Sequence, residues 1–91
     1  MRSKAKRIVI IGATSGIGLE LTKLYIQQGA MVGIAGRRED KLKEIQKKYP
    51  EQVHFECIDI TLTDSSLLIQ KLIDKVGGID IYIHCAGVGY Q

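Results

Sequence analysis

A glycine-rich turn near the start of the chain carries its clearest chemical signal. Gly12, Gly16 and Gly18 are spaced G-x-x-x-G-x-G, and Thr14 and Ser15 lie between the first two glycines. Glycine permits a sharp turn and leaves backbone N–H groups open to a phosphate, while hydroxyl groups add further donors. The spacing predicts a cradle for the pyrophosphate of a dinucleotide.

The flanking residues predict that this turn joins a strand to a helix. Residues 8–11 are apolar and β-branched, as in a parallel strand buried on both faces, and Ile17, Leu21, Leu24 and Tyr25 follow with helical spacing. Glycines also mark ordinary loops, so the turn alone leaves a plain surface loop open. The absence of a Gly-Lys-Ser/Thr ending argues against a nucleoside triphosphatase.

The rest of the chain repeats the alternation of strand and helix. Strands are predicted at 31–35, 53–60 and 79–85. Gly29 is the expected C-cap of the helix before them, and a second helix is predicted at 39–49, where Pro50 stops it. A third helix is expected to begin with Thr63 or Asp64 as its N-cap and to end at Gly77-Gly78. The expected apolar faces are Leu42, Ile45 and Tyr49 in the second helix and Leu67, Leu68, Leu72, Ile73 and Val76 in the third.

Such alternation implies right-handed crossovers and therefore a parallel sheet. We predict a Rossmann-like, three-layer α/β fold with a four-stranded parallel sheet in the order 3-2-1-4, corresponding to a truncated half of a doubly wound fold. Residues 1–91 are expected to form one dinucleotide-binding domain, with no linker, repeat or low-complexity tract.

Composition excludes several other classes of function. The net charge is +3, but basic and acidic residues alternate along the helices and only Arg2, Lys4, Lys6 and Arg7 cluster, which indicates a solvated terminus and no nucleic-acid binding. No apolar stretch approaches the length of about 20 residues that spans a membrane, and no signal peptide is evident. We therefore predict a cytoplasmic protein with no membrane partner and no metal site.

The two cysteines are predicted to be reduced. Cys57 and Cys85 fall in strands that are not neighbours in the predicted sheet, so they are interpreted as core residues.

The end of the second predicted strand indicates which dinucleotide is bound. A carboxylate normally binds the ribose 2′-hydroxyl there, but this chain has Gly36. Arg37 and Arg38 follow and offer planar donors to a 2′-phosphate, which favours NADP over NAD. The alternative is that both arginines merely begin a solvated helix and face Glu39 and Asp40.

Together these residues resemble the short-chain dehydrogenases/reductases over nearly the whole chain. The glycine turn matches their T-G-x-x-x-G-x-G motif, Gly36-Arg37-Arg38 is similar to their NADP-preferring form, Asp59-Ile60-Thr61 to their D-V-T segment, and His84-Cys85-Ala86-Gly87 stands where they have N-N-A-G. The predicted cofactor-binding residues are Gly12, Thr14, Ser15, Gly16, Ile17, Gly18, Arg37, Arg38, Asp59, Ile60, Ala86 and Gly87. The resemblance implies that Asp59 contacts the adenine and that Ala86 and Gly87 pass close to the ribose and pyrophosphate.

The chain departs from the family pattern at two places. Ile11 replaces the threonine before the first glycine, which removes a hydroxyl that would brace the turn, and His84-Cys85 replaces the paired asparagines. His84 has the chemistry of a catalytic base. Its position at a strand end favours a structural role, in which the side chain ties the sheet together.

The resemblance also implies hydride transfer between NADP and a carbonyl or alcohol, with a catalytic serine, a catalytic tyrosine and a lysine four residues after it. No tyrosine of this chain is followed by lysine at that spacing. We therefore predict no catalytic residue in this chain, which looks like the first half of such an enzyme and is expected to be inactive alone.

Two alternatives are a non-catalytic NADP-binding module and a self-assembling structural module. The predicted strand 79–83 would expose an apolar edge in a half-fold, so a homo-oligomer formed through that edge is expected.

Overall fold

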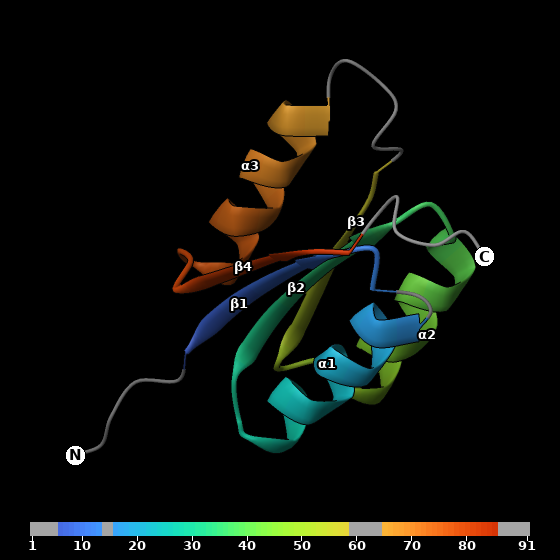
Figure 1. The fold of residues 1–91 in the computed structure, drawn as a ribbon, viewed down its shortest axis with the longest axis vertical. Coiled ribbons are helices and arrows are strands. Elements are labelled where there is room, and N and C mark those ends of the chain that lie inside the picture. Colours follow the sequence, from blue (N-terminus) through green and yellow to red (C-terminus); the bar gives the residue numbers. More distant parts are fainter. Residues whose placement is uncertain (1–5, 14–15, 59–64, 86–91) are drawn as a thin grey trace.

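The structure is a computed structural model that describes residues 6–13, 16–58 and 65–85. Strands and helices alternate along the chain (Figure 1). They are β1 (Arg7–Ile11), α1 (Gly16–Gln27), β2 (Met31–Gly36), α2 (Glu39–Lys48), β3 (Val53–Cys57), α3 (Ser65–Val76) and β4 (Ile81–His84).

The four strands form one parallel sheet in the order β3-β2-β1-β4, which confirms the predicted topology. Helices α1 and α2 cover one face and α3 covers the other, so the molecule has three layers (Figure 1). The fold is Rossmann-like, as predicted.

Each face of the sheet has its own apolar core. Alternate residues of a strand point to opposite faces, and the central strands β1 and β2 are apolar at nearly every position because both faces are covered. The core beneath α1 and α2 contains Ile8, Ile10, Val32, Ile34 and Leu42, and the core beneath α3 contains Val9, Ile11, Ala35, Ile58 and Leu72.

A glycine in β2 determines how closely α3 approaches the sheet. A Cβ at Gly33 would lie 2.7 Å from Val76 Cγ2 and 3.0 Å from Leu72 Cγ. The helix therefore packs directly on the β2 backbone at this position.

Two strands are shorter than predicted. β3 ends at Cys57 rather than at residue 60, although Ile58 is still buried and its N–H donates to the Gly36 carbonyl at 2.8 Å. β4 begins at Ile81 rather than at residue 79, because the positive φ of Gly78 precedes it and Ile79 lies outside the ladder with β1. The predicted caps Thr63 and Asp64 fall outside the described residues.

Four residues predicted to lie in the apolar patterns of the helices are exposed instead. The exposed fractions are 70% for Ile17, 47% for Leu24, 40% for Tyr49 and 67% for Leu67. The residues that face the sheet lie along rows spaced by four, which are Gly18, Thr22 and Ile26 in α1 and Leu68, Leu72 and Val76 in α3. Leu24 and Leu67 stand off these rows, and Tyr49 follows the last turn of α2 as its C-cap.

No helix in the described part of the chain is long and apolar enough to cross a membrane.

Candidate functional site

The carboxyl ends of the four strands lie together along one edge of the sheet, because all strands are parallel. Gly12, Gly36, Cys57 and His84 are at or just beyond these ends. The connection leaving β1 crosses one face, whereas the connection entering β4 crosses the other (Figure 1). The switch point between β1 and β4 is where this fold class forms its ligand crevice.

The turn after β1 is held by β2. The N–H groups of Gly12 and Ala13 both donate to the Ala35 carbonyl, at 2.8 and 3.1 Å, and Gly12 has a φ of 84°. These two backbone hydrogen bonds hold the turn in place, although Ile11 lacks the hydroxyl of the threonine that the family pattern has at this position. Both N–H groups are occupied, so among the described residues of this turn the donors open to a phosphate are those at the start of α1.

Helix α1 begins at Gly16, and the first-turn N–H groups of a helix have no partner within it. The helix dipole also favours an anion there. A Cβ at Gly16 would meet nothing within 4 Å, so the space beside this residue is open. Ile17 is 70% exposed, which leaves the approach to the helix start accessible. These observations fit a phosphate cradle.

Gly18 allows α1 to touch the turn itself. A Cβ at Gly18 would overlap the Gly12 carbonyl and approach Ala13 Cα at 3.1 Å. Thr22 is fully buried one turn later, and its hydroxyl donates to the Gly18 carbonyl at 2.8 Å. The absence of a side chain at Gly18 therefore lets the start of α1 lie against the turn after β1. Thr14 and Ser15 lie outside the described residues.

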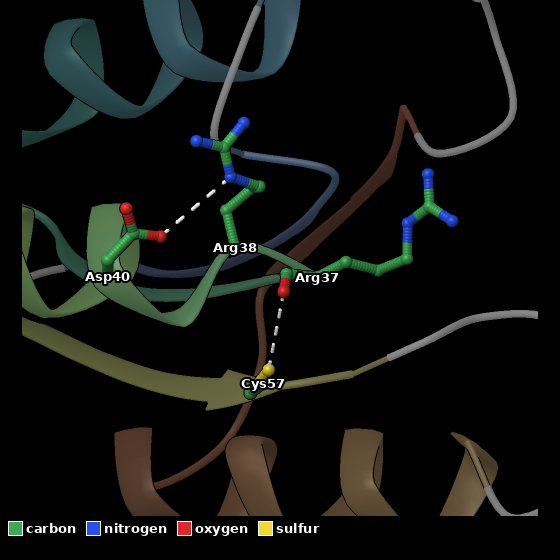
Figure 2. A network of polar contacts seen from close by, with 4 residues as sticks. All are labelled: Arg37, Arg38, Asp40 and Cys57. Carbon is green, nitrogen blue, oxygen red and sulfur yellow. Dashed lines mark hydrogen bonds and ion pairs between the residues drawn. The ribbon is translucent and has the colours of Figure 1, made fainter.

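Arg37 and Arg38 are both exposed at the end of β2. Figure 2 shows their guanidinium groups pointing in different directions. Arg38 Nε lies 3.8 Å from Asp40 Oδ1, an exposed ion pair, whereas Arg37 has no carboxylate partner in the described part of the chain. The alternative interpretation was that both arginines face acidic residues at the start of α2. In the described residues only Arg38 does so.

Cys57 is exposed, so its interpretation as a core residue is wrong. It is the last residue of the edge strand β3, and its thiol donates to the Arg37 carbonyl at 3.6 Å (Figure 2). The bond ties the end of β3 to the arginine pair. Cys85 is half-buried, and both thiols are free.

His84 bonds within its own strand. Its Nδ1 lies 2.9 Å from the Tyr82 hydroxyl, two residues earlier on the same face of β4. Within the described residues this contact runs along β4 and does not link two strands, so the expectation that His84 ties the sheet together stays a prediction. Partial burial raises the pKa of the Tyr82 phenol above its usual value, because it disfavours the charged phenolate.

Six predicted cofactor-binding residues lie outside the described residues, namely Thr14, Ser15, Asp59, Ile60, Ala86 and Gly87. The structure places Gly12, Gly16, Ile17 and Gly18 at one turn and Arg37 and Arg38 at the end of the adjacent strand.

Two side chains that connect the elements around the site, Asp80 and Lys75, were not identified from the sequence. The Arg7 N–H donates to the Asp80 carboxylate at 2.8 Å, and the Asp80 N–H donates to the Arg7 carbonyl at 2.7 Å, which joins β4 to β1. Lys75 Nζ lies 2.7 Å from Glu56 Oε2 and donates to the Phe55 carbonyl at 2.9 Å, which joins α3 to β3. The contact of Asp80 could have been suspected from the sequence, because an aspartate stands directly before an apolar strand. No sequence spacing indicates the contact between Lys75 and Glu56.

Comparison with known proteins decides the family. The family model that describes the short chain dehydrogenases matches residues 6–91 of this sequence. The chain belongs to the short chain dehydrogenase family. An oxidoreductase of Staphylococcus haemolyticus is 40% identical over 82 residues, which cover 88% of this chain and 36% of that protein.

Solved structures of family members share the fold. A short chain dehydrogenase from Bacillus anthracis is 32% identical with a TM-score of 0.72, over 85% of this chain and 34% of that one. A 3-ketoacyl-(acyl-carrier-protein) reductase from Brucella melitensis, solved with NADH, has a TM-score of 0.76 at 24% identity, over 85% of this chain and 32% of that one. The chain thus spans about a third of the length of these relatives.

Proposed function

We propose that this chain is the NADP-binding portion of a short chain dehydrogenase-type oxidoreductase. The observation that carries the proposal is the end of β2, where Gly36 leaves no carboxylate and Arg37 is exposed without an acidic partner in the described residues. A carboxylate at this position would repel a 2′-phosphate, whereas a guanidinium binds one through paired hydrogen bonds.

The proposed site combines this arginine with the glycine turn. First-turn N–H groups of α1, at Gly16, Ile17 and Gly18, would hold the pyrophosphate, and Arg37 and Arg38 the 2′-phosphate. Resemblance to the family adds Thr14 and Ser15 at the turn, Asp59 and Ile60 beside the adenine, and Ala86 and Gly87 along the ribose and pyrophosphate. NADP, when bound, supplies hydride transfer to a carbonyl or from an alcohol. The residues of this chain bind and orient the dinucleotide.

Calorimetric titration of the chain with NADP and NAD tests the proposal. We expect tighter binding of NADP, and Arg37→Ala should erase most of the difference, because a charge-assisted hydrogen bond contributes about 1.5–3 kcal/mol, or roughly 10- to 100-fold in affinity. Lys48→Ala, which removes one exposed charge from the last turn of α2, is the matched control and should leave the preference intact. Equal affinities of the unmodified chain for both dinucleotides would refute the proposed preference.

The second candidate function, a self-assembling module, is favoured by one observation. β4 is an edge strand of the sheet that the described residues form, and Tyr82 on it is 46% exposed. We propose that the chain forms a homo-oligomer through this edge.

A further inference from the structure

A buried hydroxyl group lies one helical turn after the glycine turn. Thr22 is fully buried, and within the described part of the chain it is the one buried residue with a polar side chain. It stands between Gly18 and Ile26 in the row of α1 that faces the sheet, and its hydroxyl donates to the Gly18 carbonyl at 2.8 Å. An apolar side chain would fill the same space without burying a polar atom, so packing alone does not explain a hydroxyl at this position.

The first turn of α1 is intrinsically weak as a helix. It contains Gly16 and Gly18, and glycine is the least favourable helix residue after proline. The first turn of α2 contains Glu39 and Asp40, which interact favourably with the helix dipole, whereas the first turn of α1 has no acidic residue. A carboxylate in α1 would repel a phosphate bound there. The first turn of α1 therefore depends on other contacts for its conformation.

Two contacts hold Gly18 in place. On one side it lies against the Gly12 carbonyl, and the Gly12 N–H is in turn bonded to Ala35 of β2. On the other side its own carbonyl accepts the Thr22 hydroxyl, in addition to the N–H donor that a regular helix supplies. The hydroxyl thus restrains a peptide unit to which glycine would otherwise give wide conformational freedom.

We propose that Thr22 is a positioning residue for the pyrophosphate. By holding the Gly18 carbonyl, its hydroxyl keeps the first turn of α1 helical, so that the N–H groups of Ile17 and Gly18 are oriented before the ligand arrives. Such preorganisation raises affinity because fewer groups have to be ordered on binding. Thr22 is fully buried and acts through Gly18 rather than by touching the ligand. The inference rests on the proposed binding of a dinucleotide at the glycine turn, but it does not depend on a preference for NADP.

Replacement of Thr22 by valine tests the role of the hydroxyl. Thr22→Val keeps the shape of the side chain and leaves the Gly18 carbonyl with its helical donor. We expect the free energy of unfolding in urea to stay the same or to rise, because no buried polar atom loses its partner. In calorimetric titration the affinities for NADP and NAD should both fall roughly three- to tenfold, since both ligands contain the pyrophosphate, and their ratio should stay unchanged.

Two further variants should show the opposite division between stability and binding. Thr22→Ser keeps the hydroxyl but removes a buried methyl group, so it should lower the urea midpoint and retain the affinity of the unmodified chain. Ile26→Val, one turn later in the same row, removes a buried methylene group and should also lower the midpoint without weakening binding. A purely structural role of Thr22 would instead change stability and affinity together.

The outcomes separate this inference from the proposed function. An unmodified chain that binds neither dinucleotide would overturn both. Undiminished binding by Thr22→Val, an equal loss of affinity in Thr22→Ser, or a loss confined to NADP would overturn the role of Thr22 alone. Equal affinities of the unmodified chain for NADP and NAD, both weakened by Thr22→Val, would refute the preference for NADP and uphold the role of Thr22.

Discussion

At the scale of single residues, the glycine turn is built by contacts between backbone atoms. Gly18 packs against the Gly12 carbonyl, while Gly12 and Ala13 donate to Ala35. Such contacts have no side chain that can yield when a larger residue is introduced.

Gly18→Ala should therefore abolish dinucleotide binding and destabilise the fold by about 1–3 kcal/mol, because α1 must move off the turn. Urea unfolding and calorimetric titration would measure the two effects. Gly29→Ala is the control, since Gly29 has a φ of 83° but open space around it. It should cost stability through backbone strain alone and leave binding unchanged. Unaltered binding in Gly18→Ala would contradict the role assigned to this contact.

The sequence predicted the positions of the turn and of Arg37 and Arg38 because glycine and arginine have specific conformational and chemical uses there. It missed the exposure of Cys57, since a five-residue edge strand does not bury its last position. It also missed that Ala35 holds the turn, because a backbone acceptor carries no residue preference.

At the scale of elements, the distance between α3 and the sheet depends on Gly33, because a side chain there would collide with α3. Gly33→Ala would place a methyl group 2.7 Å from Val76 Cγ2. We expect it to reduce the free energy of unfolding by about 1–3 kcal/mol through overpacking. The double variant Gly33→Ala/Val76→Ala should recover part of the loss attributed to crowding, which a double-mutant cycle of urea unfolding would detect. Strict additivity of the two changes would show that α3 does not press on β2 at this point.

The order and type of all seven elements could be predicted from apolar periodicity and glycine positions. Their boundaries and faces were less accurate. Leu67 fits a helical apolar pattern as well as Leu68 does, and only the direction in which α3 lies on β2 decides between them.

At the scale of the whole molecule, the chain spans about a third of the length of its relatives. We predict that the purified 91-residue chain has no dehydrogenase or reductase activity with alcohols or carbonyls. No tyrosine in it is followed by lysine four residues later, and general acid–base catalysis alone contributes roughly 10²- to 10⁴-fold. NADPH consumption, followed by absorbance, should equal that of a heat-denatured sample. Turnover above that level would refute the prediction.

The two hydrogen bonds between Arg7 and Asp80 also have a consequence for synthesis on the ribosome. The two residues are separated by 73 positions, whereas β1 and β2 are consecutive strands. β1 can therefore pair with β2 early, while its other side waits until Asp80 and β4 have left the exit tunnel. Throughout that interval the nascent chain presents β1 as an open edge. A chaperone that shields growing chains would thus meet a strand with four consecutive buried apolar residues first.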